Sequence, residues 1–415
     1  MRRARQRCGS GSRRRVTLVW ALAGMVPFLA LAPAGPASAR PGSPAGSSPA
    51  PYFAVTDLAP EGLPGDREHL VGEFTQPGLD DIIWYGTGKI TELRWSPCVG
   101  CPGGPFTETV LPQQVSGTYR PLVGDFAGDG LDDIFWWAPQ DLTGSDRSMD
   151  YLWTNDGSGH FTATPVDMAA GGWNPIVLSD ARSGGGKDDI LWSAWHRTSP
   201  LWVFPDDGSG KVRTAARLRV PHGIPWVGDF DGNGAADIVF YDQCDPYYCT
   251  DPAAPPDAYW RRTAGDSASF TRSVLNITGT YAPVVGQFSA SGGERDDILW
   301  LGIHESYRDS PWDGPDFLWQ GLASGRFASS KQSVPYPTSP LLLRHPGSDR
   351  VLTMIDGDVW ENRSSGSVLL PTNARASLDA EVAIFEWFAG RFTTAGTDDV
   401  ILAGDPATQL LHPTS

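Results

Sequence analysis

The sequence has few of the residues that build most catalytic centres, with five cysteines, seven histidines and five methionines among 415 residues. The histidines are scattered, and the H-E-x-x-H spacing of zinc proteases is missing. The G-x-S-x-G segment that carries the nucleophile of α/β-hydrolases is missing too. We therefore expect a protein that is not an enzyme.

Long apolar runs are missing as well, except near the N-terminus. Residues 16–32 are apolar, follow a cluster of arginines and precede Ala37-Ser38-Ala39, a small-residue cleavage site. This pattern predicts a secretory signal peptide over residues 1–39, and residues 12–16 are similar to a twin-arginine export signal. Residues 40–51 read as a Pro/Ser-rich linker. We find no second apolar stretch long enough to span a bilayer.

Basic residues are scarce, because 32 Lys and Arg stand against 48 Asp and Glu, which gives a net charge of −16. Without the seven arginines of residues 1–39, 25 basic residues remain and the net charge is −23. Such a charge repels nucleic acid and anionic lipid, so we expect neither as a partner. Part of the negative charge is gathered in loops suited to cations.

Four cysteines remain after residue 39, and they form two local pairs, Cys98 with Cys101 and Cys244 with Cys249. In an exported protein, such pairs predict two disulfides that close short loops. The alternative is a zinc ion held by all four cysteines. The two pairs lie far apart in the chain, which favours the disulfides.

The most informative stretch is VGDFDGNGAADIVFYD, residues 227–242. It places oxygen side chains at positions 1, 3, 5 and 9 of a nine-residue loop, with Gly234 at position 6 to allow a tight turn. Ca²⁺ binds six to eight oxygens at about 2.3–2.6 Å, and alternate loop positions can direct them at one point. The alternative is an Asp/Gly-rich β-turn without a metal. The expected ligands are Asp229, Asp231, Asn233, the carbonyl of Ala235, and Asp237.

The same pattern recurs along the chain, which indicates a repeat architecture. The last Asp of each loop recurs at intervals of about 50 residues, except for one interval of twice that length. Residues 341–357 fill this gap as a degenerate copy, which brings the count to seven, with Arg350-Val351-Leu352 in the place of Asp-Asp-Ile. The six clear copies end their loops at Asp81, Asp133, Asp189, Asp237, Asp297 and Asp399.

Each unit reads as four short strands rich in β-branched and aromatic residues. In the second unit these are residues 120–126, 133–138, 151–153 and 161–168. Units of this length and content predict an all-β fold, a seven-bladed β-propeller with four-stranded blades over residues 52–415. The seventh unit lacks a fourth strand, and residues 52–58 match one. We therefore expect the N-terminal strand to close the last blade.

The VGDFDGNGxxDI stretch resembles the FG-GAP/VCBS repeats, which build integrin α-subunit propellers and many secreted bacterial proteins. The resemblance covers about residues 52–412 and implies a Ca²⁺ site in the loop between the first two strands of a blade. In the fourth unit it implies Asp229, Asp231, Asn233, the carbonyl of Ala235, and Asp237 as ligands. In the second unit, where position 3 is Ala127, it implies Asp125, Asp129, the carbonyl of Leu131, and Asp133.

Two other features allow a functional and a structural interpretation. Five Asp-Asp pairs resemble the paired acids of glycosidases, but a catalytic pair has no reason to recur, so we interpret them as structural. Among 17 tryptophans, those on the second strand of a unit fit a core between blades. Those on the third strand (Trp95, Trp153, Trp202, Trp260, Trp319 and Trp360) fit the same core or a set of sugar-binding platforms. Near loops, Trp173, Trp195, Trp226, Tyr307 and Trp312 are candidates for ligand contact.

Together these patterns predict a secreted, monomeric, Ca²⁺-stabilised β-propeller that binds an extracellular glycan or protein without catalysis. One alternative is an extracellular carbohydrate-active enzyme, a lyase or hydrolase, on the same scaffold. A second alternative is a structural cell-surface protein. No individual ligand-binding residue is assigned.

Overall fold

In the computed structural model the chain divides into two compact units, Met1–Ser48 and Pro49–Ser415. All described residues belong to the second unit, and the predicted signal peptide and linker lie outside them. No described helix is long and apolar enough to cross a membrane. The described residues are 53–58, 68–86, 92–98, 105–115, 117, 119–138, 149–158, 160–166, 174–179, 187–193, 198–203, 213–221, 223–242, 257–263, 266–289, 295–302, 315–332, 334, 340–345, 348–355, 358–365, 368–372, 383–394, 397–405 and 408–413.

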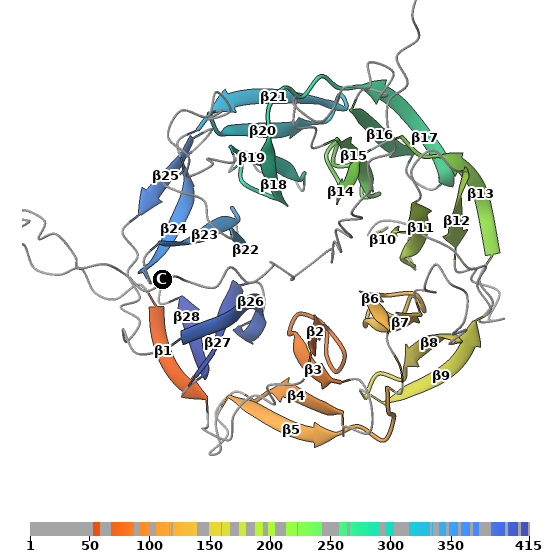
Figure 1. The fold of residues 1–415 in the computed structure, drawn as a ribbon, viewed down its shortest axis with the longest axis vertical. Coiled ribbons are helices and arrows are strands. Elements are labelled where there is room, and N and C mark those ends of the chain that lie inside the picture. The colour runs from red at the N-terminus through yellow and green to blue at the C-terminus, as the bar shows by residue number, and fades with distance from the viewer. Residues whose placement is uncertain are drawn as a thin grey trace, which may run out of the picture. The chain divides into compact units, whose positions relative to one another are not determined.

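These residues form seven antiparallel sheets of four strands each, which we number along the chain (Figure 1). Sheets 1 and 2 consist of β2(Glu68–Gly72), β3(Asp81–Tyr85), β4(Leu93–Pro97) and β5(Phe106–Val110), then β6(Arg120–Gly124), β7(Asp133–Trp137), β8(Asp150–Asn155) and β9(Phe161–Val166). Sheets 3 and 4 consist of β10(Asn174–Leu178), β11(Asp189–Ser193), β12(Thr198–Val203) and β13(Arg213–Arg219), then β14(Ile224–Gly228), β15(Asp237–Tyr241), β16(Ala258–Thr263) and β17(Asp266–Val274).

Sheets 5 and 6 consist of β18(Tyr281–Gly286), β19(Asp297–Gly302), β20(Phe317–Leu322) and β21(Arg326–Lys331), then β22(Leu341–Leu343), β23(Arg350–Ile355), β24(Asp358–Ser365) and β25(Val368–Thr372). Sheet 7 consists of β26(Ala383–Thr394), β27(Thr397–Asp405), β28(Thr408–Pro413) and β1(Phe53–Leu58). Its outer strand β1 comes from the beginning of the second unit and pairs with β28, from Phe53 opposite Pro413 to Leu58 opposite Thr408. The all-β class and the four-stranded blades of a β-propeller are confirmed.

In sheets 1 and 2 the second strand is buried and the fourth strand is mostly exposed. All five residues of β3, β7, β11 and β15 are buried, whereas β5 and β9 are mostly exposed. The second strands are apolar on both faces because neighbouring sheets cover both. The first strands lie innermost in Figure 1, and the fourth strands lie outermost.

Proline protects the free edge of four first strands. Pro121, Pro175, Pro225 and Pro283 lie opposite Trp136, Trp192, Phe240 and Trp300 of the second strands. Proline has no N–H to offer to another strand, so it suits an edge and discourages unwanted pairing.

The tryptophans of the second strand form the core between sheets, as predicted. Trp136 belongs to one buried cluster with Leu70, Ile83 and Tyr85 of sheet 1. Its ring lies 5.0 Å from that of Tyr85 and 5.1 Å from that of Trp153, both edge to face. Core packing also holds for the third-strand residues Trp153 and Trp260, which are buried. Among the loop candidates only Trp226 lies within the described residues, where it packs against a core cluster; Trp173, Trp195, Tyr307 and Trp312 lie outside them.

A backbone hydrogen bond joins each sheet to the next at the start of every second strand. The donor is the amide of the residue just before the second strand, or of Asp398 near the start of β27. The acceptor is a carbonyl just after the first strand of the neighbouring sheet, or that of Arg391 within β26, over 2.7–2.9 Å. The seven bonds form a cycle that includes the junction of sheets 7 and 1. They run from Asp80 to Arg391, Asp132 to Glu73, Asp188 to Asp125, Ala236 to Ser179, Asp296 to Asp229, Asp349 to Gln287 and Asp398 to Arg344.

At six of these seven junctions, the carboxylate of the donating residue also accepts a hydrogen bond from an amide of the neighbouring sheet. Asp132 Oδ2 accepts the amide of Glu73, for example, over 2.8 Å. The same geometry holds for Asp188, Asp296, Asp349, Asp398 and Asp80, which accept the amides of Asp125, Asp229, Gln287, Arg344 and Arg391. We call this two-bond junction the carboxylate seam. Sheet 4 has Ala236 at this position, and there a buried ion pair between Arg262 and Asp189 connects sheets 3 and 4.

The carboxylate seam corrects one sequence alignment. In sheet 6, Asp349 makes the seam, and Arg350 is the residue opposite Leu343 at the end of β22. Asp349-Arg350-Val351 therefore takes the place of Asp-Asp-Ile, and the predicted alignment of Arg350-Val351-Leu352 was wrong by one residue. This degenerate unit has an aspartate at the first position, where Asp349 makes two hydrogen bonds to Gln287 of sheet 5.

Glycine at the end of the first strand makes room for the seam. A Cβ on Gly124 would lie 2.7 Å from Asp188 Oδ2 and 3.1 Å from a methyl group of Val177 in sheet 3. Gly72, Gly228 and Gly286 approach the carboxylates of Asp132, Asp296 and Asp349 in the same way. The recurring Val-Gly pair therefore allows close approach at these four seams, whereas Leu343 ends the first strand beside the seam of Asp398 with Arg344.

We predict that Gly124→Ala lowers the free energy of unfolding by about 1–3 kcal/mol, because the added methyl group pushes Asp188 off the amide of Asp125. Denaturant unfolding measures the change. Thr162→Ala, on the exposed face of β9, is the control and should change stability by less than about 0.5 kcal/mol. Equal effects of the two substitutions would contradict the close-approach argument.

Candidate metal centre

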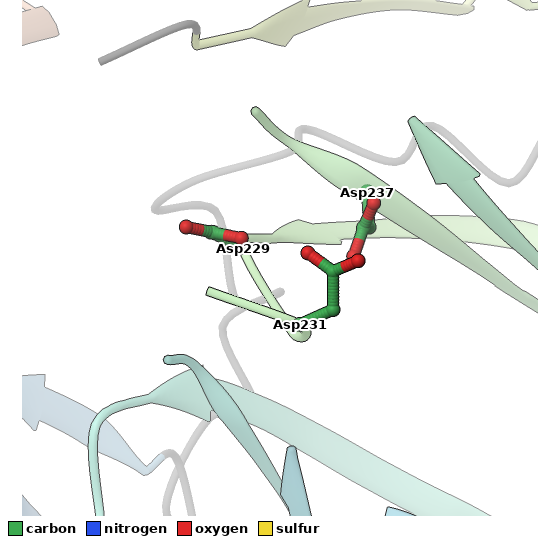
Figure 2. Close-up of side chains that lie close together, drawn as sticks. All are labelled: Asp229, Asp231 and Asp237. Carbon is green, nitrogen blue, oxygen red and sulfur yellow. The ribbon is translucent and has the colours of Figure 1, made fainter. Parts of the chain in front are cut away.

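The loop between β14 and β15 brings three carboxylates together. Gly232 and Gly234 adopt φ of 74° and 87°, which lets residues 229–237 turn tightly. Asp229, Asp231 and Asp237 each offer an oxygen, and these oxygens all lie within 4.8 Å of one another. Oxygens on opposite sides of one Ca²⁺ ion would be about 4.6–5.2 Å apart, so this spacing fits a shared ion. Figure 2 shows Asp231 turned toward Asp237, with Asp229 beside them.

Asp237 serves the fold and the cluster together. It is fully buried, and its oxygens accept bonds from the Tyr259 hydroxyl and the Arg262 amide, both over 2.7 Å. Burial raises the pKa of Asp237 to about 7, and the negative charges of Asp231 and Asp229 add to this effect. Burial likewise raises the pKa of Asp229. A divalent cation between these groups would favour their ionised forms.

The remaining predicted ligands of this loop hold its shape. Asn233 Oδ1 accepts the amide of Ala235 over 2.8 Å, and its side-chain nitrogen donates to the Arg262 carbonyl over 2.9 Å. Asp229 accepts the amides of Asn233 and Gly234. These bonds fix the turn before any ion binds. Metal contacts of Asn233 and of the Ala235 carbonyl stay predictions.

Two arginines border the cluster. Arg261 Nε lies 3.6 Å from Asp231 Oδ2, and its side chain is about one third exposed. Arg295 of sheet 5 packs its carbon chain against Gly232 and donates to the Gly321 carbonyl over 3.0 Å. The loop is thus covered by the neighbouring sheet, while Arg261 offsets part of its negative charge.

The corresponding loop of sheet 2 is held by its own amides. Asp125 accepts the amides of Gly128, Asp129 and Gly130, and Asp129 accepts that of Leu131. Asp133 is buried and accepts the amides of Ala127 and Asn155. Asp125, Asp129 and Asp133 do not gather as Asp229, Asp231 and Asp237 do, as far as the described residues show. The Ca²⁺ ligands implied here, including the Leu131 carbonyl, stay predictions.

At the junction of sheets 7 and 1 an arginine side chain lies among the acidic residues. Arg391 takes the first loop position of sheet 7, and its guanidinium contacts Glu73 and Asp80, with 3.0 Å to Asp80 Oδ1. An arginine here neutralises the acids that would otherwise be left close together.

The repeated Asp-Asp pairs are accounted for by hydrogen bonds. The first Asp of a pair makes the carboxylate seam to the neighbouring sheet. The second Asp is buried and holds its own sheet: Asp297 accepts the amides of Ser289 and Gly321 over 2.7 and 2.8 Å. This division of roles explains why the pair recurs and supports the structural interpretation.

A second repeated carboxylate was missed in the sequence. An acid directly before or at the start of the third strand accepts an amide at or just after the end of the second strand, and in sheets 1, 4 and 5 it also accepts one that follows the fourth strand. Asp316 accepts the amides of Gly302 and Val334, over 2.9 and 2.8 Å. Glu92, Asp150 and Asp257 act similarly in sheets 1, 2 and 4. Comparing the residue three positions before each third-strand tryptophan would have revealed it.

Cys98 follows β4 and is disulfide-bonded. Cys101, Cys244 and Cys249 lie outside the described residues, so the two predicted pairings stay predictions.

No protein-family model matches the sequence, and no curated protein matches it either. Among solved structures, BBS1N in complex with ARL6DN is similar, with a TM-score of 0.43 and 6% identity, over 88% of this chain and 98% of that one. AofleA from Arthrobotrys oligospora is similar with a TM-score of 0.41 and 9% identity, over 77% of this chain and 90% of that one. At these values neither similarity indicates what this chain binds.

The seam carboxylates predict an unusual dependence of stability on pH. Burial raises the pKa of Asp132 and of Asp398 to about 6, above the usual value near 3.9. A raised folded-state pKa contributes stability that is complete below the unfolded pKa and is lost as pH rises through the folded one. With metal removed by a chelator, we expect a higher melting temperature at pH 5 than at pH 7.5.

The variant Asp398→Asn keeps an oxygen for the Arg344 amide but cannot ionise. Its melting temperature should therefore fall less between pH 5 and pH 7.5 than that of the parent protein. A parent protein that becomes more stable as pH rises over this range would contradict the prediction.

Proposed function

We propose that this protein is a secreted, Ca²⁺-stabilised, seven-bladed β-propeller that acts as a non-catalytic binding module for an extracellular glycan or protein. The observation that carries the calcium part is the convergence of Asp229, Asp231 and Asp237 in one loop. The leader pattern of residues 1–39 supports export.

In this proposal the seven sheets are the seven blades of one closed ring. The cycle of seven inter-sheet hydrogen bonds, with sheet 7 joined to sheet 1, supports closure. The pairing of β1 with β28 supports the N-terminal strand as the outer strand of the last blade. A ring joined at every seam presents its loops from a rigid base, which suits recognition.

Asp229, Asp231 and Asp237 would hold the ion, together with Asn233 and the carbonyl of Ala235. The ion would supply positive charge to three carboxylates, two of which burial makes hard to ionise. Because the loop also contacts sheet 5 through Arg295, binding would stabilise the whole ring and not only one hairpin.

We predict that Ca²⁺ raises the melting temperature of the parent protein and not that of Asp231→Asn. An ion present at 100 times its dissociation constant adds about 2.7 kcal/mol to stability by mass action. Asparagine keeps an oxygen for the amide of Asn233 but removes one charge. Thermal unfolding with chelator and with Ca²⁺ measures the difference.

The matched control is Asp156→Asn, in the exposed turn after β8, which removes the same charge away from the cluster. It should respond to Ca²⁺ as the parent protein does. Equal Ca²⁺ responses of Asp231→Asn and the parent would rule out this loop as the site.

The binding role is tested by screening the Ca²⁺-loaded protein against a glycan array and a panel of extracellular proteins. The proposal expects saturable binding that weakens when the protein is unfolded. No binding across both panels would count against it.

A further inference from the structure

The outer strands of sheets 3, 4 and 5 carry an unusual concentration of positive charge. Their third and fourth strands, β12, β13, β16, β17, β20 and β21, contain eight arginines and lysines and one acid, Asp266. The chain as a whole has the opposite balance, with a net charge of −16. Among those whose side chains the structure describes, the exposed ones are Arg217, Arg219, Arg272, Arg326 and Lys331, which we call the basic rim.

The charges of the basic rim are available to a partner. Arg217 and Arg219 are exposed on either side of the buried Leu218, so both point to one face of β13, about 7 Å apart along the strand. None of the five residues forms an ion pair with any described residue. Arg272 lies over the ring of Trp260 at 4.1 Å, which holds its guanidinium in place.

The basic rim extends across three neighbouring sheets. Strands β13 and β17 contact each other. Arg261 of β16 donates to the carbonyl of Ser324 in the turn that precedes β21, over 3.4 Å. The three outer strands follow one another along the outside of the unit in Figure 1.

The outer strands of the other sheets lack this charge. In sheets 1, 2, 6 and 7 the third and fourth strands contain two basic residues, Arg94 and Arg363. They contain five acids: Asp57, Glu108, Asp150, Asp358 and Glu361. The positive charge is therefore local to one side, and screening over about 8 Å at physiological salt lets it act separately from the acidic remainder.

We propose that the basic rim binds an anionic polysaccharide, one that carries carboxylate or sulfate groups. Guanidinium groups bind such anions through paired hydrogen bonds. A flexible polymer with charges spaced along it can follow the row of exposed side chains and needs no apolar groove. Double-stranded nucleic acid fits less well, because a duplex with a persistence length of about 50 nm cannot follow a curved row of side chains as a flexible polymer can. The acidic remainder of the protein also repels its dense charge. This inference rests on the proposed binding role and names the ligand class.

The test compares binding of heparin, polygalacturonate, neutral dextran and duplex DNA to the full-length protein at physiological salt. We expect heparin or polygalacturonate to bind, dextran not to bind, and DNA to bind more weakly than either. The double variant Arg217→Gln with Arg219→Gln should bind the anionic polysaccharide about tenfold more weakly, since two exposed ionic contacts are lost.

The matched control is Thr162→Glu with Thr164→Glu on β9, the exposed fourth strand of sheet 2. It lowers the net charge by the same two units at equivalent spacing on another sheet, and it should bind as the parent does. Melting temperatures of both variants verify folding.

Equal losses in the two variants would overturn the basic rim, because net charge alone would then explain binding. Tighter binding of DNA, or no binding of either polyanion by the parent protein, would overturn it as well. In that last case, a neutral glycan or protein ligand found by the array would leave the proposed function standing.

Discussion

The carboxylate seam is the constraint on which the rest of this structure depends. An aspartate at the start of the second strand of one sheet makes two bonds to one residue of the neighbouring sheet. Its amide donates to the carbonyl of that residue, and its carboxylate accepts the amide of that residue, as Asp132 does with Glu73. These bonds are partly buried between sheets, and an amide left unpaired in a buried place costs about 1–3 kcal/mol. The seam therefore fixes the spacing of the sheets. It also favours glycine at the end of the first strand, as at Gly72, Gly124, Gly228 and Gly286, and leaves the loop backbone in a set shape.

The candidate metal loop is the place where this scheme is modified. Sheet 4 has Ala236 instead of an aspartate, and Arg262 performs the linking role. Its amide and carbonyl hold Asp237 and Asn233, while its guanidinium pairs with Asp189 of sheet 3. The loop with the three converging carboxylates is thus tied directly to the neighbouring sheet, so an ion bound there would act on the junction as well as on the hairpin.

The fold could be predicted from the sequence because the repeat is visible in it: a turn-forming loop, an Asp-Ile strand start and aromatic second strands recur at regular intervals. The three converging carboxylates were predicted for the same reason. The seam was not, because a hydrogen bond between residues 59 positions apart leaves no local pattern. The degenerate unit of sheet 6 was misaligned by one residue because Arg350 takes the place of the second Asp. Its register becomes clear only from the hydrogen bond between Asp349 and Gln287. The basic rim was not predicted because its residues lie on β13, β17 and β21, which are far apart in the sequence and become neighbours only in the folded protein.

Amide hydrogen exchange at the seams tests this account most directly. The amides of Glu73, Asp125, Asp229, Gln287 and Arg344 lie in loops, and that of Arg391 lies in the irregular end of β26, but all six donate to seam carboxylates. The account predicts that they exchange as slowly as amides in the buried second strands, with Arg391 at the junction of sheets 7 and 1 as protected as the others. Exchange as fast as in the exposed turn at residues 156–158 would contradict it.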